Sequence, residues 1–111
     1  MRRIRSGKQG EGCSGGCPAG ATVDVIGGRW KVPVLWHLFG GTKRFGELKR
    51  ALPDVTAKML TQQLRELEEA GVVRRKVFAQ VPPKVEYSLT ARGESLRPVV
   101  DAMCKWAAGR G

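Results

Sequence analysis

The feature that most constrains this chain is a change of hydrophobic period at Gly71. On its N-terminal side, apolar residues recur every three or four positions, as on one face of a helix: Ala57, Leu60, Leu64 and Leu67. On its C-terminal side, apolar residues alternate with polar ones, as in a half-buried strand: Val85, Tyr87 and Leu89. The pattern predicts a helix capped by Thr56, then strands over 72–78 and 84–89 joined by a hairpin tip at 80–83.

Shorter elements are predicted upstream of this helix. One helix begins at Pro18 and ends at Gly27-Gly28, since Pro suits the first helical position and Gly the C-terminal end. A second covers 30–39 and, being apolar nearly all round, is expected to be the buried central helix. A short extended piece over 42–45 and a third helix over 45–52 follow, and Pro53-Asp54 then makes a tight turn.

The chain is predicted to finish with a long helix over 91–108. Thr90 caps this helix, and Pro98 inside it is expected to produce a bend. The order is then helix, helix, short strand, helix, turn, helix, hairpin, helix. Two helices joined by a tight turn and followed by a basic hairpin are typical of a winged helix-turn-helix. The predicted fold class is therefore mainly α (α+β), with a two-stranded wing.

The charge balance indicates an anionic partner. Twenty Lys and Arg against ten Asp and Glu give a net charge of +10, which nucleic acid, here double-stranded DNA, explains most simply. Residues 1–16 are basic and Gly-rich with almost no apolar groups. They are expected to form a disordered tail that either touches DNA phosphates or is solvated. The folded domain is then 17–111.

The expected location of the protein is the cytoplasm, at the nucleoid, with no membrane partner. No stretch approaches the roughly 20 apolar residues needed to cross a bilayer. The basic N-terminus is not followed by an apolar run, so it does not read as a secretory signal. In this compartment Cys13, Cys17 and Cys104 are expected to be thiols.

The polar face of the helix after Thr56 is the predicted recognition surface. Lys58, Thr61 and Gln62 are expected to read base edges in a major groove, where Lys suits guanine, Gln suits adenine and Thr suits a base or a phosphate. Arg65 is expected to contact a phosphate. An ordinary amphipathic helix with a solvated polar face fits the same pattern. Three acids lie toward the far end of the helix, where they are expected to avoid the phosphates: Glu66, Glu68 and Glu69.

The hairpin favours the DNA-binding interpretation. It carries four cations with no acid between Val72 and Lys84, and these are Arg74, Arg75, Lys76 and Lys84. A basic hairpin placed directly after a recognition helix can straddle the DNA backbone or enter the minor groove. Arg44, at the short extended piece, enlarges the basic surface.

Five segments, in order, resemble the HxlR family of winged-helix transcription regulators, which is related to the MarR group. They are CP at 17–18, DVIGGRWK at 24–31, RFGEL at 44–48, MLTQQLRELE at 59–68 and VPPKVEYSLT at 81–90. The resemblance implies a homodimer on operator DNA with an inverted repeat, joined through N- and C-terminal dimerisation helices. The implied interface residues, some of which also suit the interior of the monomer, are Val23, Ile26, Leu96, Val99, Val100, Met103 and Trp106.

The resemblance also implies a switch, because some members of the family sense oxidants or electrophiles through the cysteine that corresponds to Cys17. Cys17 precedes Pro18 at a helix N-terminus, where the helix dipole favours the thiolate, the reactive form. Cys13 could resolve a sulfenic acid on Cys17, and a passive role for both thiols stays open. A small ligand is the alternative inducer. Cys104 is expected to be a buried structural thiol.

Other functions compete with that of a regulator, for which we expect repression. A winged helix can also serve as an interaction module without sequence preference. A thiol redox enzyme is disfavoured because the spacing of Cys13 and Cys17 is not C-x-x-C, and no catalytic triad, carboxylate pair or phosphate loop suggests another enzyme. A zinc site made of the cysteines and His37 lacks paired ligand spacing, so no metal and no cofactor are expected.

Overall fold

The computed structural model describes residues 17–109, so the predicted tail over 1–16, with Cys13, lies outside the described residues. The elements are α1 (Ala19–Ile26), α2 (Lys31–Leu38), β2 (Lys43–Arg44), α3 (Phe45–Ala51), α4 (Ala57–Glu69), β3 (Val73–Phe78), β4 (Lys84–Leu89), α5 (Ala91–Glu94) and α6 (Arg97–Gly109). The predicted winged helix-turn-helix is confirmed: α3 and α4 form the helix-turn-helix, and β3 and β4 form the wing.

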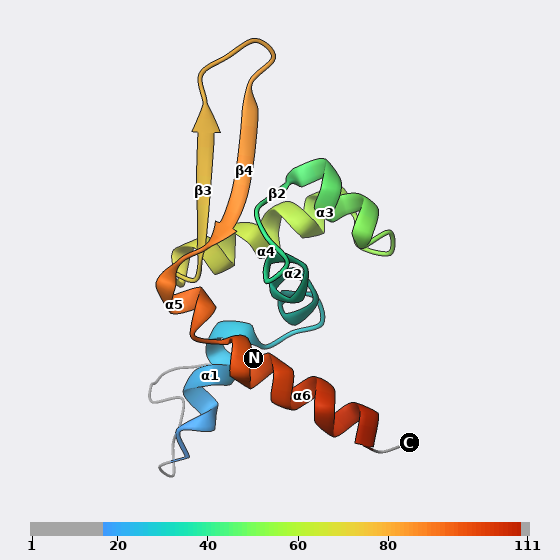
Figure 1. Cartoon of the computed structure of the whole chain (residues 1–111), viewed down its shortest axis with the longest axis vertical. Helices are drawn as coiled ribbons and strands as arrows, with labels where there is room; N and C mark the ends of the chain where they lie inside the picture. Colours follow the sequence, from blue (N-terminus) through green and yellow to red (C-terminus); the bar gives the residue numbers. More distant parts are fainter. Residues whose placement is uncertain (1–16, 110–111) are drawn as a thin grey trace.

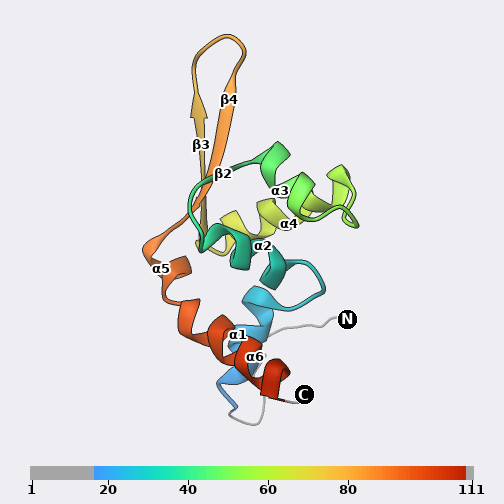
Figure 2. The ribbon, with the colours of Figure 1, turned by 45° about the vertical axis from the view of Figure 1, so that its right-hand side comes forward.

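The hairpin and the terminal helices lie at opposite ends of the molecule. Figures 1 and 2 show the β3–β4 hairpin projecting away from the helices, while α1 and α6 lie at the other end. The sheet has three antiparallel strands in the order β2-β4-β3, because the short strand β2 pairs with β4. Lys43 lies opposite Tyr87, and Arg44 lies opposite Glu86. The predicted extended piece thus belongs to the wing's sheet.

The hydrophobic core lies between α2, α3, α4 and the base of the hairpin. Leu35, Leu48 and Leu60 come from the three helices and have no exposed surface. The helix α2 crosses this core, as its apolar sequence predicts, and buries Val34, Leu35 and Leu38, but it is not buried on every side. Trp36 lies on its outer side and is more than half exposed.

The bounds of α4 follow from its first and last residues. The hydroxyl of Thr56 accepts a hydrogen bond from the Met59 backbone N–H at 3.0 Å, which satisfies a donor that the first turn leaves unpaired. Gly71 ends the helical segment with φ +81°, a conformation that favours glycine. Leu60, Leu64 and Leu67 are buried as predicted. Ala57, assigned to the same stripe, is instead exposed, because the core does not extend to the first turn.

A tight corner joins the end of α4, the start of β3 and the start of α5. The Thr90 hydroxyl donates to the Gly71 carbonyl at 2.6 Å and accepts from the Gly93 backbone N–H at 3.1 Å. Gly93 packs so closely that an added Cβ would lie 2.1 Å from the Val72 carbonyl oxygen. No side chain fits at this position, so α5 is held directly against the base of the wing.

The predicted last helix is two helices. The first, α5, ends at Glu94, and α6 begins at Arg97 after a turn at Ser95 and Leu96. Pro98 is the second residue of α6. A proline in the first turn removes no hydrogen bond that the helix needs, whereas a proline in the middle of one helix would. The expected bend is therefore a break that lies just before the proline.

Candidate nucleic-acid interface

The four residues predicted for recognition on α4 lie together on its exposed side. Lys58, Thr61, Gln62 and Arg65 line one shallow hollow with Ala57. All five are exposed, and the buried leucines of α4 lie on the opposite side. The face thus carries two cations and two neutral hydrogen-bonding side chains, which is chemistry suited to the edges and backbone of a major groove.

The two neutral side chains on this face are already hydrogen-bonded. The Thr61 hydroxyl donates to the Ala57 carbonyl oxygen at 2.8 Å, so its oxygen is left to act as an acceptor. The Gln62 amide nitrogen donates to Oε2 of Glu66 at 2.9 Å. These bonds limit which groups Thr61 and Gln62 can offer to a ligand.

Glu66 connects the recognition face to α2. Its Oε1 lies 2.5 Å from Nζ of Lys31, the first residue of α2, and the same ammonium group donates to Oε1 of Gln63 at 3.0 Å. The bond from Lys31, followed by the bond from Gln62, holds the pKa of the Glu66 carboxyl below its usual value, against the opposing effect of burial. Lys31 belongs to the segment 24–31 that resembles the family, but its contact with Glu66 is not predicted from the sequence.

The acids of α4 do not stay clear of the predicted surface. Glu66 is hydrogen-bonded to Gln62, a predicted readout residue. Glu68 lines a hollow together with Arg65 and Arg75. Both carboxylates therefore border predicted contact residues, and the expectation that they avoid the DNA phosphates stays a prediction. The four-residue spacing of Gln62 and Glu66 is the sequence signal from which their contact could be predicted, since side chains four positions apart meet on a helix.

The basic residues of the wing lie on two different faces of the sheet. In the register, Arg75 is opposite Tyr87, whereas Lys76 is opposite Glu86 and Phe78 is opposite Lys84. Residues directly opposite each other share a face, and faces alternate along a strand. Arg75 therefore shares the face of the buried Tyr87, while three predicted DNA contacts occupy the other face: Arg74, Lys76 and Lys84.

Arg75 is the wing residue that meets the recognition helix. It lines a hollow with Thr61, Arg65 and Glu68 of α4 and with Tyr87 of β4. Arg75 of the wing and Arg65 of α4 thus border the same hollow, which they share with the Glu68 carboxylate. The hairpin and the helix are brought together at this hollow rather than at the hairpin tip.

The outer face of the wing is less basic than its sequence suggests. The ammonium groups of Lys76 and Lys84 lie 5.0 and 4.5 Å from the centre of the Phe78 ring, within the range of cation–π contact. Lys84 also pairs with Glu86 at 3.5 Å. Arg44 lies opposite the same glutamate across the sheet. Glu86 follows the acid-free segment in sequence, yet it stands among the wing's cations.

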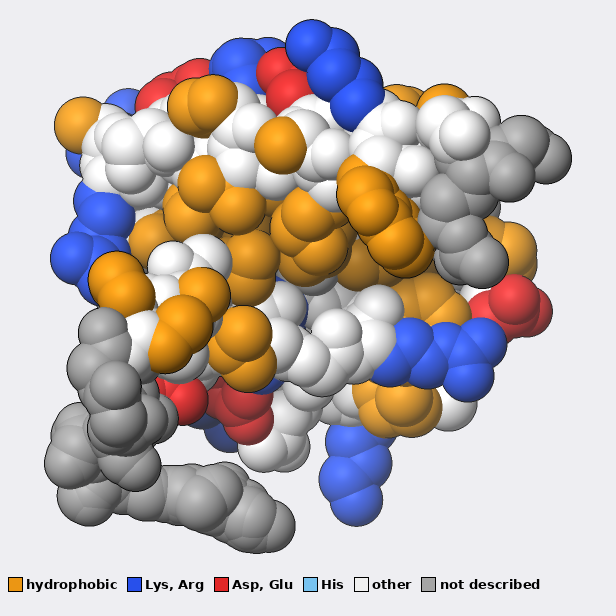
Figure 3. Space-filling view, turned by 90° about the horizontal axis from the view of Figure 1, so that it is seen from below, with side chains coloured by type: hydrophobic (Ala, Val, Ile, Leu, Met, Phe, Trp, Pro, Cys, Tyr) orange, Lys and Arg blue, Asp and Glu red, His pale blue; other side chains and the backbone are white. Residues whose placement is uncertain are grey.

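The described part of α1 and α6 carries exposed apolar side chains, which we call the terminal apolar surface: Val23, Val99, Met103 and Trp106. Figure 3, which views the molecule from the end opposite the wing tip, shows hydrophobic side chains gathered across this face. Ile26 and Val100 are instead buried inside the single chain, and Leu96 packs partly against the core. These three residues belong to the interior or its margin, which narrows the predicted interface.

The two described cysteines are both exposed. Cys17 lies just before α1, where its carbonyl oxygen accepts from the Gly20 backbone N–H at 3.2 Å. Cys104 lies on α6, and its predicted burial is wrong, because no other part of the described chain covers that side of the helix. Within residues 17–109, no group of three or more His, Cys, Asp and Glu side chains could hold a metal ion.

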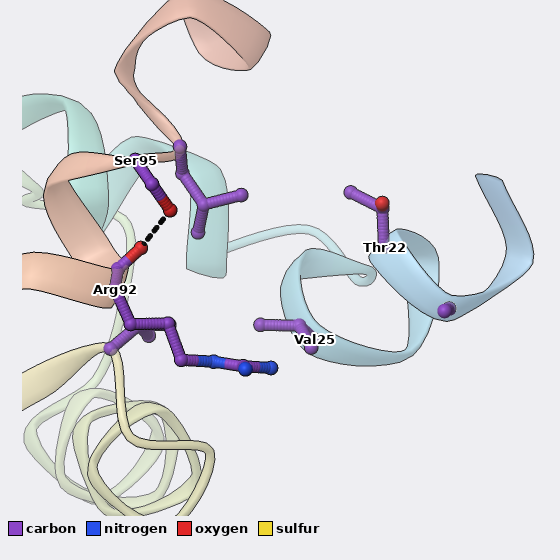
Figure 4. Close-up of a pocket in the computed structure, with 7 residues that line it drawn as sticks. Thr22, Val25, Arg92 and Ser95 are labelled. Atoms are coloured by element: carbon purple, nitrogen blue, oxygen red, sulfur yellow. Dashed lines mark hydrogen bonds between the residues drawn. The ribbon is translucent and has the colours of Figure 1, made fainter. Parts of the chain in front are cut away.

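A hollow of about 220 Å³ separates α1 from α5. It is lined by Ala21, Thr22, Val25, Val72, Arg92, Ser95 and Leu96. Figure 4 shows the Arg92 side chain extending from α5 toward α1 past Val25. The Ser95 hydroxyl is turned away from this space, since it donates to the Arg92 carbonyl.

None of the helices described over residues 17–109 has the length and hydrophobicity that crossing a membrane requires.

Known proteins are similar to this chain in sequence and in fold. Residues 25–110 match the family model described as HxlR-like helix-turn-helix. The chain is similar to the HTH-type transcriptional regulator YdeP of Bacillus subtilis (strain 168), at 55% identity over 82% of this chain and 71% of YdeP. It is also similar to the redox regulator HypR. The oxidised form superimposes with a TM-score of 0.80 at 53% identity, over 84% of this chain and 96% of HypR. The reduced form gives 0.81 at 52% identity, over 84% and 92%.

Proposed function

We propose a function from the family: the chain belongs to the HxlR-like helix-turn-helix family of DNA-binding transcriptional regulators. In this proposal it binds an inverted-repeat operator as a homodimer and represses transcription. The observation that carries this proposal is that cations of α4 and of the wing lie beside each other. Arg65 of α4 and Arg75 of β3 line one hollow there, directly beside the exposed side chains of Lys58, Thr61 and Gln62.

In this proposal α4 enters the major groove. Lys58, Thr61 and Gln62 contact base edges, and Arg65 contacts the phosphate backbone. Arg75 continues the backbone contact from the wing. A second group of cations on the outer face of the sheet contacts the flanking DNA: Arg44, Arg74, Lys76 and Lys84. The protein works in the cytoplasm, at the nucleoid, and a dimer on the promoter blocks transcription.

The terminal apolar surface supports the homodimer. Val23 is 61% exposed, Met103 46% and Trp106 68%, and they lie on the two terminal helices away from the DNA-facing surface. Contiguous exposed apolar side chains of this size mark contact surfaces in soluble proteins. A two-fold axis between two copies of this surface would set two α4 helices into successive major grooves about 34 Å apart.

We propose that oxidation of Cys17 switches the regulator. The thiol is exposed, and the similar protein HypR is described as a redox regulator, with an oxidised and a reduced form. A peroxide would convert the thiolate to a sulfenic acid, and a second thiol would then displace water to form a disulfide. Cys13, which lies outside the described residues, is the candidate for that second thiol.

A small-molecule inducer is the alternative switch. The hollow between α1 and α5 is the place for it, because its apolar lining ends at the Arg92 guanidinium. Its volume of about 220 Å³ is below the roughly 300–1,000 Å³ of typical pockets for drug-sized ligands. The size of the hollow therefore favours the thiol switch.

A footprint on the DNA upstream of the protein's own gene tests these proposals. The expected result is a protected palindrome that disappears after addition of hydrogen peroxide and persists in Cys17→Ser. In vitro transcription from the same promoter should fall when the reduced protein is added. Equal affinity for the promoter and for random DNA would instead support an interaction module without sequence preference. Loss of the footprint with peroxide in Cys17→Ser as well would remove Cys17 as the sensor.

A further inference from the structure

The amide of Gln62 is held in one orientation by a carboxylate of its own helix. Its nitrogen lies 2.9 Å from Oε2 of Glu66. An ionised carboxylate can only accept hydrogen bonds, and an amide has one donating and one accepting end. The reversed amide would place two acceptor oxygens against each other, so Glu66 excludes it.

The carboxylate that sets this orientation is itself fixed from a second helix. Lys31 of α2 donates to the other oxygen of Glu66, and its side chain is only 13% exposed. Gln63 occupies a second donor of the same ammonium group. The lowered pKa of Glu66 agrees with a carboxylate that is ionised at neutral pH. The chain of contacts from Lys31 through Glu66 to Gln62 is called the Gln62 tether below.

The tether leaves a defined pair of groups on Gln62. One N–H and the carbonyl oxygen Oε1 have no partner among the described residues. In the major groove, adenine presents an acceptor, N7, beside a donor, the N6 amino group, and Gln pairs with both. An A·T pair and a T·A pair present this donor–acceptor order in opposite directions across the groove. A fixed amide therefore matches one of the two directions.

We propose that Lys31 and Glu66 are positioning residues that determine the base preference of the recognition helix. By fixing the Gln62 amide, they make α4 select adenine on one strand of its half-site and reject the reversed base pair. This inference rests on the proposed function, because it requires α4 to lie in the major groove.

Base preference is the measurement that tests the tether. Operators are selected from randomised duplex DNA with the wild type and with Gln62→Ala. The position at which the wild type prefers A·T over T·A, and Gln62→Ala does not, is the position that Gln62 reads. A well-placed bidentate contact predicts a wild-type preference of about tenfold at that position. Glu66→Gln, which keeps the side-chain size, should remove this preference, because Lys31 would hold the new amide oxygen and leave its N–H group facing Gln62, which disfavours the wild-type orientation of the Gln62 amide.

Lys31 supplies a graded test. Lys31→Met removes the cation that fixes Glu66 and should weaken the preference without removing the carboxylate. Lys31→Arg keeps the cation and should restore the preference toward the wild-type ratio. A merely structural role for the pair would change stability or total affinity, but it would not change the ratio between A·T and T·A.

Glu69→Gln is the matched control for charge. It removes one carboxylate from the same helix, and the Glu69 carboxylate is exposed and makes no hydrogen bond or ion pair within the described residues. Both glutamate variants should bind non-specific DNA more tightly than the wild type, because each loses one charge that repels phosphates. Only Glu66→Gln should also lose base preference.

A chemical change in the DNA repeats the test without relying on an altered fold. Replacing the selected adenine by 7-deazaadenine removes N7, the acceptor for the Gln62 N–H. The wild type should lose affinity about tenfold, and Glu66→Gln should lose less. An unchanged A·T preference in Glu66→Gln, or a Gln62→Ala variant that changes no position, overturns the inference. A wild type that selects no sequence at all overturns the proposed function instead.

Discussion

The helices α4 and α6 are both thirteen residues long, yet they use their apolar residues differently. The first buries three leucines in the core of the chain, and its exposed side is polar and basic. The second buries only Val100, and its exposed side includes Val99, Met103 and Trp106. The core that the single chain builds stabilises α4 completely and α6 only at its start. The polar side of α4 and the apolar side of α6 are what remain for two different partners.

This contrast divides the molecule into two parts. We call the part proposed to contact DNA the reading part, and the part proposed to join two protomers the joining part. The reading part consists of α2, α3, α4 and the three strands, which enclose almost all of the buried residues. The joining part consists of α1 and α6. From Asp101 onward every described residue of α6 is exposed, and an isolated helix of this length is marginally stable in water.

The largest loss of unfolding free energy is expected from Leu64→Ala in the reading part. Leu64 is 1% exposed, and a cavity at such a site costs about 2–5 kcal/mol of unfolding free energy. Urea unfolding followed by circular dichroism measures the change. Glu69→Ala on the same helix should change stability by less than about 0.5 kcal/mol, since its side chain is exposed. Equal losses for the two variants would mean that α4 does not define the core.

A charge in the joining part should separate the protomers of the proposed homodimer and leave each one folded. Met103→Glu places a carboxylate on the terminal apolar surface, where a partner would have to bury it, and should weaken dimerisation about 100-fold. Analytical ultracentrifugation measures the dimer, and urea unfolding of the monomer measures the reading part. Lys105→Glu introduces the same residue on the other side of α6 and should leave the dimer intact. A Met103→Glu protein that stays dimeric would place the interface elsewhere.

A smaller effect is expected where the wing meets α4. Arg75→Ala should lower operator affinity about tenfold and reduce the slope of log affinity against log salt by about one, as the loss of one phosphate contact does. Fluorescence anisotropy at several salt concentrations gives both numbers. Lys105→Ala removes an equal charge from the joining part and should change neither. If the two variants behaved alike, net charge rather than the reading surface would govern binding.

The smallest effect belongs to the ion pair between Lys31 and Glu66. The Glu66 side chain is 40% exposed, so solvent screening limits the stabilisation to about 0.5 kcal/mol. Its pKa in the folded protein is lowered from the ordinary value of 4.5, so this stability is present above that value and is lost as the pH falls through the folded pKa. Urea unfolding should therefore show Glu66→Gln less stable than the wild type at pH 7, by a difference that shrinks as the pH is lowered below 4.5. A difference that did not depend on pH would have another cause.

The order of the elements could be predicted because local signals mark their ends. Thr56 caps α4, Gly71 ends it, and the alternation after it gives the wing. Pro98 predicts a bend in the last helix, whereas the structure has a break between α5 and α6 just before the proline. Periodicity alone could not show how far the core extends. For this reason the apolar spacing predicts that Ala57 and Cys104 are buried, whereas both are exposed.

The candidate site was only partly predictable for the same reason. The α4 residues share one face of one helix, so their spacing suffices to group them. The separation of Arg75 from its two neighbours follows from strand alternation, but its approach to Arg65 depends on how the hairpin leans on α4. The contact of Lys31 with Glu66 joins residues 35 positions apart. Only the packing of α2 on α4 brings them together.

The corner at Thr90 has a consequence for the length of the operator. The Thr90 hydroxyl joins the end of α4 to the start of α5, and Gly93 leaves no gap between α5 and the wing. A dimer built through α6 would then hold its two α4 helices at a fixed distance and angle to each other. One base pair added between the half-sites turns the second half-site by about a tenth of a turn around the DNA axis. A rigid dimer cannot follow that rotation, so all operators that it binds would have the same spacer length.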